Sequence, residues 1–125
     1  MTTTKLLIVD DEEELRELLG ALLADIASEI MYAKNGQEAI ELLTKESFDA
    51  VLSDQKMPMK TGIEVLEWLR GQGKQTPFIM HTGFDEPDVK DRAKSLGAYA
   101  YIQKPWDVKF LSKTVREAVE LGSKK

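Results

Sequence analysis

The stretch "LLIVDDEEE", residues 6–14, decides the fold of this chain. Its first four residues are apolar without a break, which is typical of a short strand that is buried on both faces of a parallel sheet. Acids follow at once, and glutamates at the start of a helix suit the positive end of the helix dipole. The stretch therefore predicts a buried strand, then an acidic turn, then a helix.

The same alternation of short apolar runs and helical patterns continues along the chain. Apolar runs predict strands at residues 5–9, 30–33, 49–53, 77–81 and 99–102. Apolar residues at helical spacing predict a helix after each run. The first helix carries Leu15, Leu18, Leu19, Leu22, Leu23 and Ile26, and the last carries Leu111, Val115, Ala118 and Val119. Strands that alternate with helices predict an α/β domain, in which a parallel sheet has helices on both faces.

Turn and cap residues separate these elements. Asn35 and Gly36 form a turn before the second helix, and Gly71 lies where the third helix should end. Asp85 and Pro87 mark the start of the fourth helix, because aspartate favours the N-cap and proline the first turn. Gly97 and other glycines mark helix ends.

Composition limits the class of protein. The chain has 125 residues, of which 42% are apolar and 31% charged, so we expect one globular domain spanning residues 1–125, with its core at about 4–121. It has no cysteine, which excludes disulfides and thiolate metal sites and agrees with the cytoplasmic location that we expect. A net charge of −5 argues against direct binding of nucleic acid. No apolar run reaches the roughly 18 residues of a membrane span.

Reactive side chains follow four of the predicted strands. Asp10 and Asp11 follow the first strand, Asp54 the third, Thr82 the fourth and Lys104 the fifth. The carboxyl ends of parallel strands form the ligand-binding edge of such a sheet, so we expect these side chains to converge. Clustered carboxylates repel one another unless a cation joins them. Mg²⁺ suits this cluster because it prefers oxygen ligands and keeps several waters.

A carboxylate beside Mg²⁺, with an amine and a hydroxyl near it, suits phosphoryl transfer. Catalysis of this reaction depends on positioning and on neutralising the charge of the phosphoryl oxygens. Asp54 is the candidate nucleophile and would form an acyl phosphate. The cation, Lys104 and Thr82 would each meet one phosphoryl oxygen.

With these residues in order, the chain resembles the receiver domain of two-component response regulators. The resemblance rests on "IVDD" at 8–11, "DQKMP" at 54–58 with Gly62 after it, "HTG" at 81–83 and "GAYAYIQKPW" at 97–106. Together these pieces extend across nearly the whole chain. The resemblance implies a flavodoxin-like, doubly wound (βα)5 three-layer sandwich with parallel strand order 2-1-3-4-5.

The resemblance also implies a phosphorylation-controlled switch of the single-domain chemotaxis type. Its Mg²⁺, or alternatively Mn²⁺, would assist transfer from a histidine kinase or phosphotransfer protein. The resemblance implies that Asp54 is the phosphoacceptor and that Asp54, Asp11 and the Lys56 backbone carbonyl bind the metal directly, with Asp10 binding it through water. It implies that Lys104 and Thr82 contact the phosphoryl group and that the peptide bond before Pro105 is cis. The implied switch residues are Thr82 and Tyr101.

The output implied by the resemblance is bacterial signalling rather than turnover of a substrate. Such a protein is not an enzyme but assists its own phosphorylation and dephosphorylation. Phosphorylation would shift the surface of the fourth helix, fifth strand and fifth helix, and so control a downstream protein or an output domain. The chain would act as a monomer or as a phosphorylation-dependent homodimer.

Simpler interpretations exist for single residues. Asp10 and Asp11 also suit capping of the first helix, and Asp54 alone suits a turn. Tyr101 suits strand packing, and Tyr99 has the same parity. His81 replaces the aliphatic residue usual in receivers, and we expect it to be structural and partly buried.

Other functions also remain open. A flavin mononucleotide carrier shares the strand order but needs a hydroxyl- and glycine-rich phosphate loop, where this chain has "DDEEE" at residues 10–14. A phosphohydrolase with an aspartyl nucleophile would need a cap, and we find no insertion long enough. A receiver that binds proteins without phosphorylation is a further alternative. So is a module of a longer regulator, although we expect a stand-alone protein because only "SKK" follows Gly122.

Overall fold

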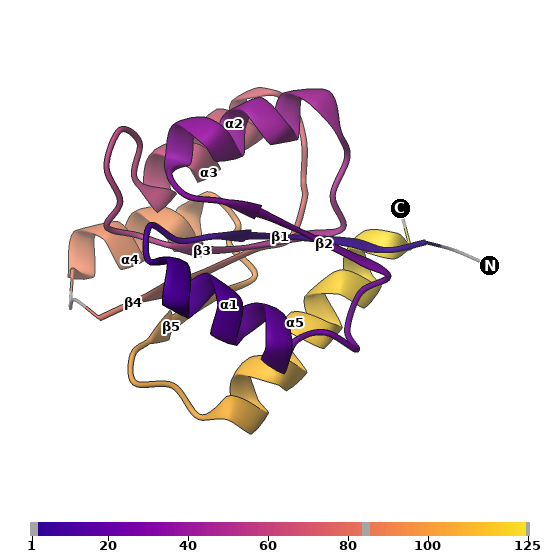
Figure 1. Ribbon diagram of the computed structural model, residues 1–125. Coiled ribbons are helices and arrows are strands. Elements are labelled where there is room, and N and C mark those ends of the chain that lie inside the picture. Colours follow the sequence, from indigo (N-terminus) through magenta and orange to yellow (C-terminus); the bar gives the residue numbers. More distant parts are fainter. Residues whose placement is uncertain (1–2, 84–85, 125) are drawn as a thin grey trace.

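The computed structural model describes residues 3–83 and 86–124, which form alternating strands and helices (Figure 1). The strands are β1 (Lys5–Val9), β2 (Glu29–Ala33), β3 (Ala50–Asp54), β4 (Phe78–Thr82) and β5 (Ala100–Gln103). The helices are α1 (Glu13–Leu22), α2 (Gly36–Lys45), α3 (Gly62–Gly71), α4 (Pro87–Ser95) and α5 (Val108–Ser123).

All neighbouring strands of the sheet are parallel, in the order β2-β1-β3-β4-β5. This confirms the predicted doubly wound α/β fold and its strand order. The chain first adds β2 on one side of β1 and then adds β3 on the other side, so the winding direction reverses at β1 and β3. Crevices for ligands form at such a reversal, beyond the carboxyl ends of the strands.

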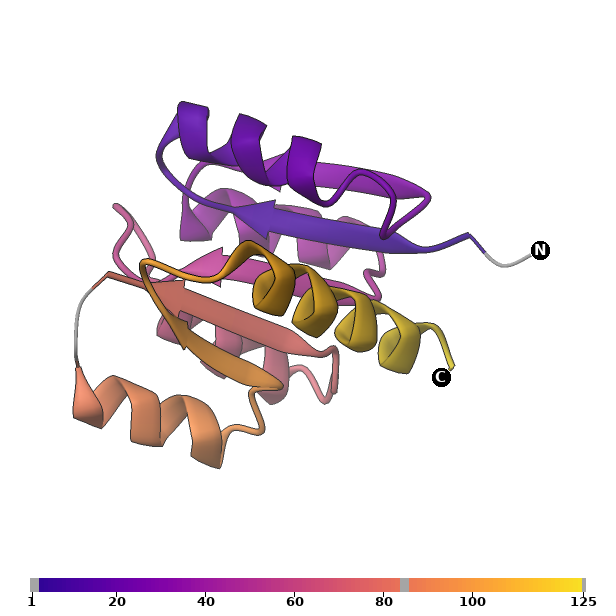
Figure 2. The same ribbon diagram turned by 90° about the horizontal axis from the view of Figure 1, so that it is seen from below.

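Helices cover both faces of the sheet and make three layers. Helices α1 and α5 lie on one face, and α2, α3 and α4 lie on the other (Figures 1 and 2). Along β1, Leu6 and Ile8 pack toward α1 and α5, whereas Leu7 and Val9 pack into the opposite core. All four side chains are fully buried, so the unbroken apolar run of β1 follows from its central place in the sheet.

Helix caps agree with the local sequence. The side chain of Asn35 accepts a hydrogen bond from Glu38 N at 2.7 Å, and Thr61 and Glu64 form a capping box at the start of α3. Gly97 follows α4 with a φ of +74°, a conformation that favours glycine. These local signals fix where the helices start and stop around the sheet.

Some predicted boundaries differ from the structure. Helix α1 ends at Leu22, so Ile26 lies beyond it, and Leu18 is 50% exposed. The apolar face of α1 is therefore narrower than its leucine content predicts, because only one side of the helix meets the sheet. Helix α4 begins at Pro87, and Asp85, its predicted start, lies outside the described residues.

Over residues 3–83 and 86–124, none of the helices combines the length and the apolar character that a membrane crossing requires.

Candidate functional site

Two buried carboxylates lie at the carboxyl edge of the sheet, at the point where the winding reverses. Asp10 directly follows β1 and is fully buried, and Asp54 is the last residue of β3 and is 7% exposed. Asp11 and Glu12 are exposed beside them, and one carboxylate oxygen each of Asp10, Asp11 and Glu12 lies within 4.8 Å of the others. The fold thus gathers acids from separate parts of the sequence.

Backbone and side-chain contacts fix Asp10 in this place. Its N–H donates to Ala33 O at 3.1 Å, and its Oδ1 accepts from Glu12 N at 2.9 Å. The guanidinium of Arg16, on α1, donates to Asp10 O at 2.6 Å. The turn that carries the acids is therefore held from β2 on one side and from α1 on the other.

Asp54 lies beside the single amine predicted for the site. Its Oδ2 is 3.6 Å from Lys104 Nζ, and its Oδ1 accepts from Gln55 N at 2.8 Å. Lys104 N donates to Thr82 O at 2.7 Å, and the Lys104–Pro105 peptide bond is cis. The structure therefore brings together Asp54 at the end of β3 and Lys104 after β5, with β4 between these two strands.

The electrostatics of the two buried acids differ from those of acids in water. Burial raises the pKa of Asp10 to about 6, and repulsion from Asp54 adds to this, although the Glu12 N–H and Lys104 oppose it. Burial also raises the pKa of Asp54, against the opposing effects of Lys104 and the Gln55 N–H. Both carboxylates thus lack full compensation for their negative charge.

These residues fit a hard divalent cation. Partly compensated carboxylates at the edge of a sheet, with exposed Asp11 beside them, supply the oxygen donors that Mg²⁺ prefers. Asp10 Oδ2 has no hydrogen-bond partner among residues 3–83 and 86–124, so one buried acceptor still needs a positive or donating group. Lys56, predicted to supply a backbone carbonyl, lies two positions after Asp54, and its side chain is exposed.

Capping of α1 does not account for the acids. The N-cap residue of α1 is Glu12, and its side chain makes no capping hydrogen bond within the described part of the chain. Among residues 3–83 and 86–124, the side chain of Asp10 accepts a hydrogen bond only from the N–H of that N-cap residue. The acidic turn therefore keeps its outward-facing oxygens available to a ligand.

Thr82 and Tyr101, the two predicted switch residues, lie on the neighbouring strands β4 and β5. Thr82 ends β4 and is fully buried, and Tyr101 of β5 is paired with Met80 in the sheet register. Side chains two positions apart on a strand point to the same face, so Thr82 and Tyr101 face the core under α3 and α4. Tyr101 packs against that core and is half-buried.

Sequence reasoning missed three contacts of the site. His81 is fully buried rather than partly buried, and its Nε2 lies 3.8 Å from Asp10 Oδ2. Arg16 donates a hydrogen bond to the backbone of the acidic turn, and its position in the first turn of α1 agrees with this contact. Gln55 Oε1 accepts from Ile63 N at 2.8 Å and so ties the loop after Asp54 to α3, for which the sequence offers no signal.

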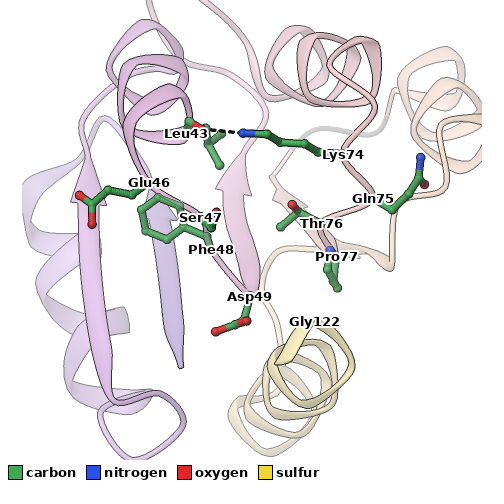
Figure 3. Close-up of a pocket in the computed structure, with 10 residues that line it drawn as sticks. All are labelled: Leu43, Glu46, Ser47, Phe48, Asp49, Lys74, Gln75, Thr76, Pro77 and Gly122. Carbon is green, nitrogen blue, oxygen red and sulfur yellow. Dashed lines mark hydrogen bonds between the residues drawn. The ribbon is translucent and has the colours of Figure 1, made fainter. Parts of the chain in front are cut away.

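A cavity lies at the amino ends of β3 and β4, which are the ends opposite to these acids. Figure 3 shows this pocket of about 320 Å³, and its lining residues are Leu43, Glu46, Ser47, Phe48, Asp49, Lys74, Gln75, Thr76, Pro77 and Gly122. Its charges are already paired: Lys74 Nζ donates to Leu43 O at 3.1 Å, and the Glu46 carboxylate pairs with the ammonium of Lys5. Reactive groups therefore gather at the carboxyl edge and not in this pocket.

Comparison with known proteins identifies this arrangement. The model of the response regulator receiver domain matches residues 6–116. Sporulation initiation phosphotransferase F of Bacillus subtilis is 33% identical over 123 residues, which cover 98% of this chain and 99% of that protein. Response regulator protein PilR of Pseudomonas aeruginosa is 36% identical over 121 residues, which cover 97% of this chain but 27% of PilR. This chain thus spans only about a quarter of that relative.

Solved structures agree with the sequence relatives. The chemotaxis protein CheY4 of Vibrio cholerae superposes with a TM-score of 0.82 at 34% identity, covering 93% of this chain and 98% of that chain. A CheY-like response regulator receiver domain protein from Methanospirillum hungatei superposes with a TM-score of 0.90 at 27% identity, covering 98% of each chain. Family model, relatives and fold agree, and we conclude that this chain belongs to the response regulator receiver domains of two-component signalling.

Proposed function

We propose that this protein is a phosphorylation-controlled switch in which Asp54 accepts a phosphoryl group from a histidine kinase or a phosphotransfer protein, with Mg²⁺ bound beside it. The observation that carries the proposal is the buried Asp54 carboxylate, which lies 3.6 Å from Lys104 Nζ and next to Asp10 and Asp11, in a chain of the receiver family. Mn²⁺ has similar ligand preferences and is the alternative cation.

In the proposed transfer, one oxygen of Asp54 forms a bond to phosphorus. The bond between phosphorus and the donor's histidine nitrogen breaks, and its electron pair leaves with that imidazole. Asp11, Asp54 and the Lys56 carbonyl would hold the cation directly, and Asp10 would hold it through water. The bound cation would neutralise charge on the transferred group.

Two of the chain's own groups would meet the phosphoryl oxygens. Lys104 lies at Asp54 already and would exchange its ion pair with the carboxylate for one with the phosphoryl group. Thr82 ends the neighbouring strand and would offer its hydroxyl as a donor. Fixed donors at the position where charge develops supply most of the catalysis in such transfers.

The signal would leave through α4, β5 and α5. Thr82 and Tyr101 face the same core, so movement of Thr82 toward the phosphoryl group would open space for the Tyr101 ring. A shallow groove between α4 and β5 adjoins this tyrosine and is lined by Lys90, Lys94, Ala98, Tyr99, Ala100 and Tyr101. A downstream protein or an output domain that reads this groove would then sense phosphorylation.

The test is phosphoryl labelling of Asp54→Asn. Purified protein is mixed with a small-molecule phosphodonor and Mg²⁺, and the added phosphoryl group is counted by intact mass. We expect the wild type to gain one group and Asp54→Asn to gain none, because an amide is not a nucleophile for this reaction.

Asp49→Asn is the matched control, since Asp49 directly precedes the same strand, at the end opposite to Asp54. It should be labelled like the wild type. Equal labelling of Asp54→Asn and the wild type would show that the acceptor is another residue, and a wild type that stays unlabelled with every donor would contradict the switch itself.

A further inference from the structure

His81 stands in the middle of the site although neither the fold nor the proposed transfer explains it. It belongs to β4 and is paired in the sheet register with Asp54 of β3. Register partners point to the same face, so the His81 and Asp54 side chains both point toward the α1 and α5 side. The imidazole nevertheless reaches past β3, and its Nε2 lies 3.8 Å from Asp10 Oδ2, at the end of β1.

Both members of this contact are wholly buried and incompletely satisfied. Within the described ranges 3–83 and 86–124, His81 Nδ1, His81 Nε2 and Asp10 Oδ2 have no hydrogen-bond partner. Leaving a buried polar group unpaired costs about 1–3 kcal/mol. A hydrophobic side chain, such as those of Phe78, Ile79 and Met80 in the same strand, would avoid this cost. The imidazole is therefore retained in a place where it destabilises the fold, which points to a functional reason.

The geometry explains what the imidazole can do. The separation of 3.8 Å is too long for a hydrogen bond, but a shift of less than an ångström would bring Nε2 within the usual N–H···O range of about 3 Å. Asp10 Oδ1 already has a donor, the N–H of Glu12. Among residues 3–83 and 86–124, Oδ2 is the oxygen of Asp10 that lacks a donor, and the neutral imidazole carries one N–H that can point at it.

We propose that His81 is a positioning residue of the cation pocket: when the pocket holds its cation, His81 Nε2–H donates to Asp10 Oδ2 and fixes that carboxylate in the orientation that binds the cation's water. The inference rests on the proposed function, because it assumes a cation beside Asp10. Hydrogen bonds to ligating carboxylates orient them, and loss of such a partner lowers metal affinity by about 10–100-fold.

Two substitutions separate this role from simple packing. His81→Leu removes the donor and fills similar space, and His81→Gln keeps an N–H donor at nearly the reach of Nε2. We expect Mg²⁺ affinity, measured by NMR titration of the backbone amides, to fall by about 10–100-fold in His81→Leu and to stay within about threefold of wild type in His81→Gln.

The chain contains one histidine, so its imidazole nitrogens can be observed without overlap. In ¹⁵N spectra of the wild type, addition of Mg²⁺ should shift the Nε2 signal toward that of a hydrogen-bonded N–H. This readout does not depend on how well the variants fold.

The outcomes distinguish the two proposals. Wild-type affinity in His81→Leu, equal losses in His81→Leu and His81→Gln, or a histidine spectrum unchanged by Mg²⁺ would each overturn the role of His81 and leave the switch intact. A wild type that neither binds Mg²⁺ nor accepts a phosphoryl group would overturn the proposed function, and the role of His81 with it.

Discussion

An aspartate directly precedes β3 and another ends it, and the two lie in opposite electrostatic situations. At the amino end, Asp49 Oδ2 accepts a hydrogen bond from Lys5 N at 2.8 Å, and the ammonium of Lys5 pairs with Glu46. At the carboxyl end, Asp54 is nearly buried and lies with Asp10 near one lysine. One end therefore uses its acids to hold the chain together, and the other keeps acids whose charge is only partly compensated.

The comparison teaches that the presence of a cavity is a poor guide to chemistry in this molecule. The amino end has the well-formed cavity of Figure 3, but its charged groups are used in contacts within the protein. The carboxyl end has burial that raises the pKa of both Asp10 and Asp54. A bound cation can offset the unfavourable free energy of burying these carboxylates, which makes the carboxyl end the candidate site.

The largest expected difference between the two ends concerns their lysines. Lys104→Met removes the amine 3.6 Å from Asp54, and we expect the initial rate of phosphoryl labelling to fall roughly 10²–10³-fold, the effect of losing one donor to a developing charge. Rates would be measured by mass spectrometry at fixed phosphodonor and saturating Mg²⁺.

Lys74→Met is the matched change at the amino end, where Lys74 Nζ donates to Leu43 O. It should leave the labelling rate unchanged and lower the free energy of unfolding by about 1 kcal/mol. A comparable loss of rate in both variants would mean that the two ends are not electrostatically distinct.

Two glycines provide the next test, because each one touches the backbone of an aspartate. A β-carbon added at Gly62 would lie 2.5 Å from Asp54 O, and one added at Gly122 would overlap Asp49 O. Alanine at either position should lower the free energy of unfolding by about 1–3 kcal/mol, as measured by urea denaturation, because backbone must move to admit the methyl group.

Only Gly62→Ala should also slow the labelling of the folded protein, since the displaced backbone is that of Asp54. Gly122→Ala moves the C-terminal turn of α5 away from Asp49 and should be labelled at the wild-type rate. If the two variants behaved alike in labelling, the position of the Asp54 backbone would not limit the transfer.

The smallest expected effect is a dependence of stability on pH without divalent cation. The pKa of Asp10 is raised to about 6, so the folded state binds more protons than the unfolded state between about pH 4 and 6, and stability from Asp10 rises as pH falls. Burial lowers the pKa of His81 to about 3, so the unfolded state binds more protons below about pH 6.5, and stability from His81 falls as pH falls.

These two buried groups oppose each other between pH 7 and pH 5. The free energy of unfolding of the wild type should therefore change little, by about 1 kcal/mol or less. Asp10→Asn should lose up to about 2 kcal/mol over this range from the His81 effect, which the raised pKa of Asp54 opposes in part, and His81→Leu should gain about 1–2 kcal/mol. Thermal or urea unfolding at both pH values measures this, and parallel pH profiles for all three proteins would contradict the assignment.

Much of the fold could be predicted from the sequence because its signals are local. The strand Lys5–Val9 was predicted with the bounds that the structure has, because four apolar residues and a lysine stand between the polar residues Thr4 and Asp10. The observed bounds of the other strands differ from the predicted ones by one residue, because pairing between strands, and not the local sequence, decides which residues end a strand. Leu18 belongs to the apolar pattern that predicted the first helix, yet it is 50% exposed, because helix periodicity does not reveal how wide a face the sheet can cover.

The candidate site divides in the same way. Asp10, Asp54, Thr82 and Lys104 were placed at one edge from strand ends alone, and their roles remain proposals. The contact between His81 and Asp10 joins residues of β4 and β1 across an intervening strand, and no spacing in the sequence encodes it.

By itself the sequence determined the alternation of strands and helices, the parallel sheet and the edge on which acids gather, because periodicity and chain direction are properties of neighbouring residues. Only the tertiary structure decided which of those acids are buried, which have partners and which carboxylate oxygen faces an imidazole. Desolvation and Coulomb interactions depend on distances through space, and the packing of β1, β3 and β4 sets those distances.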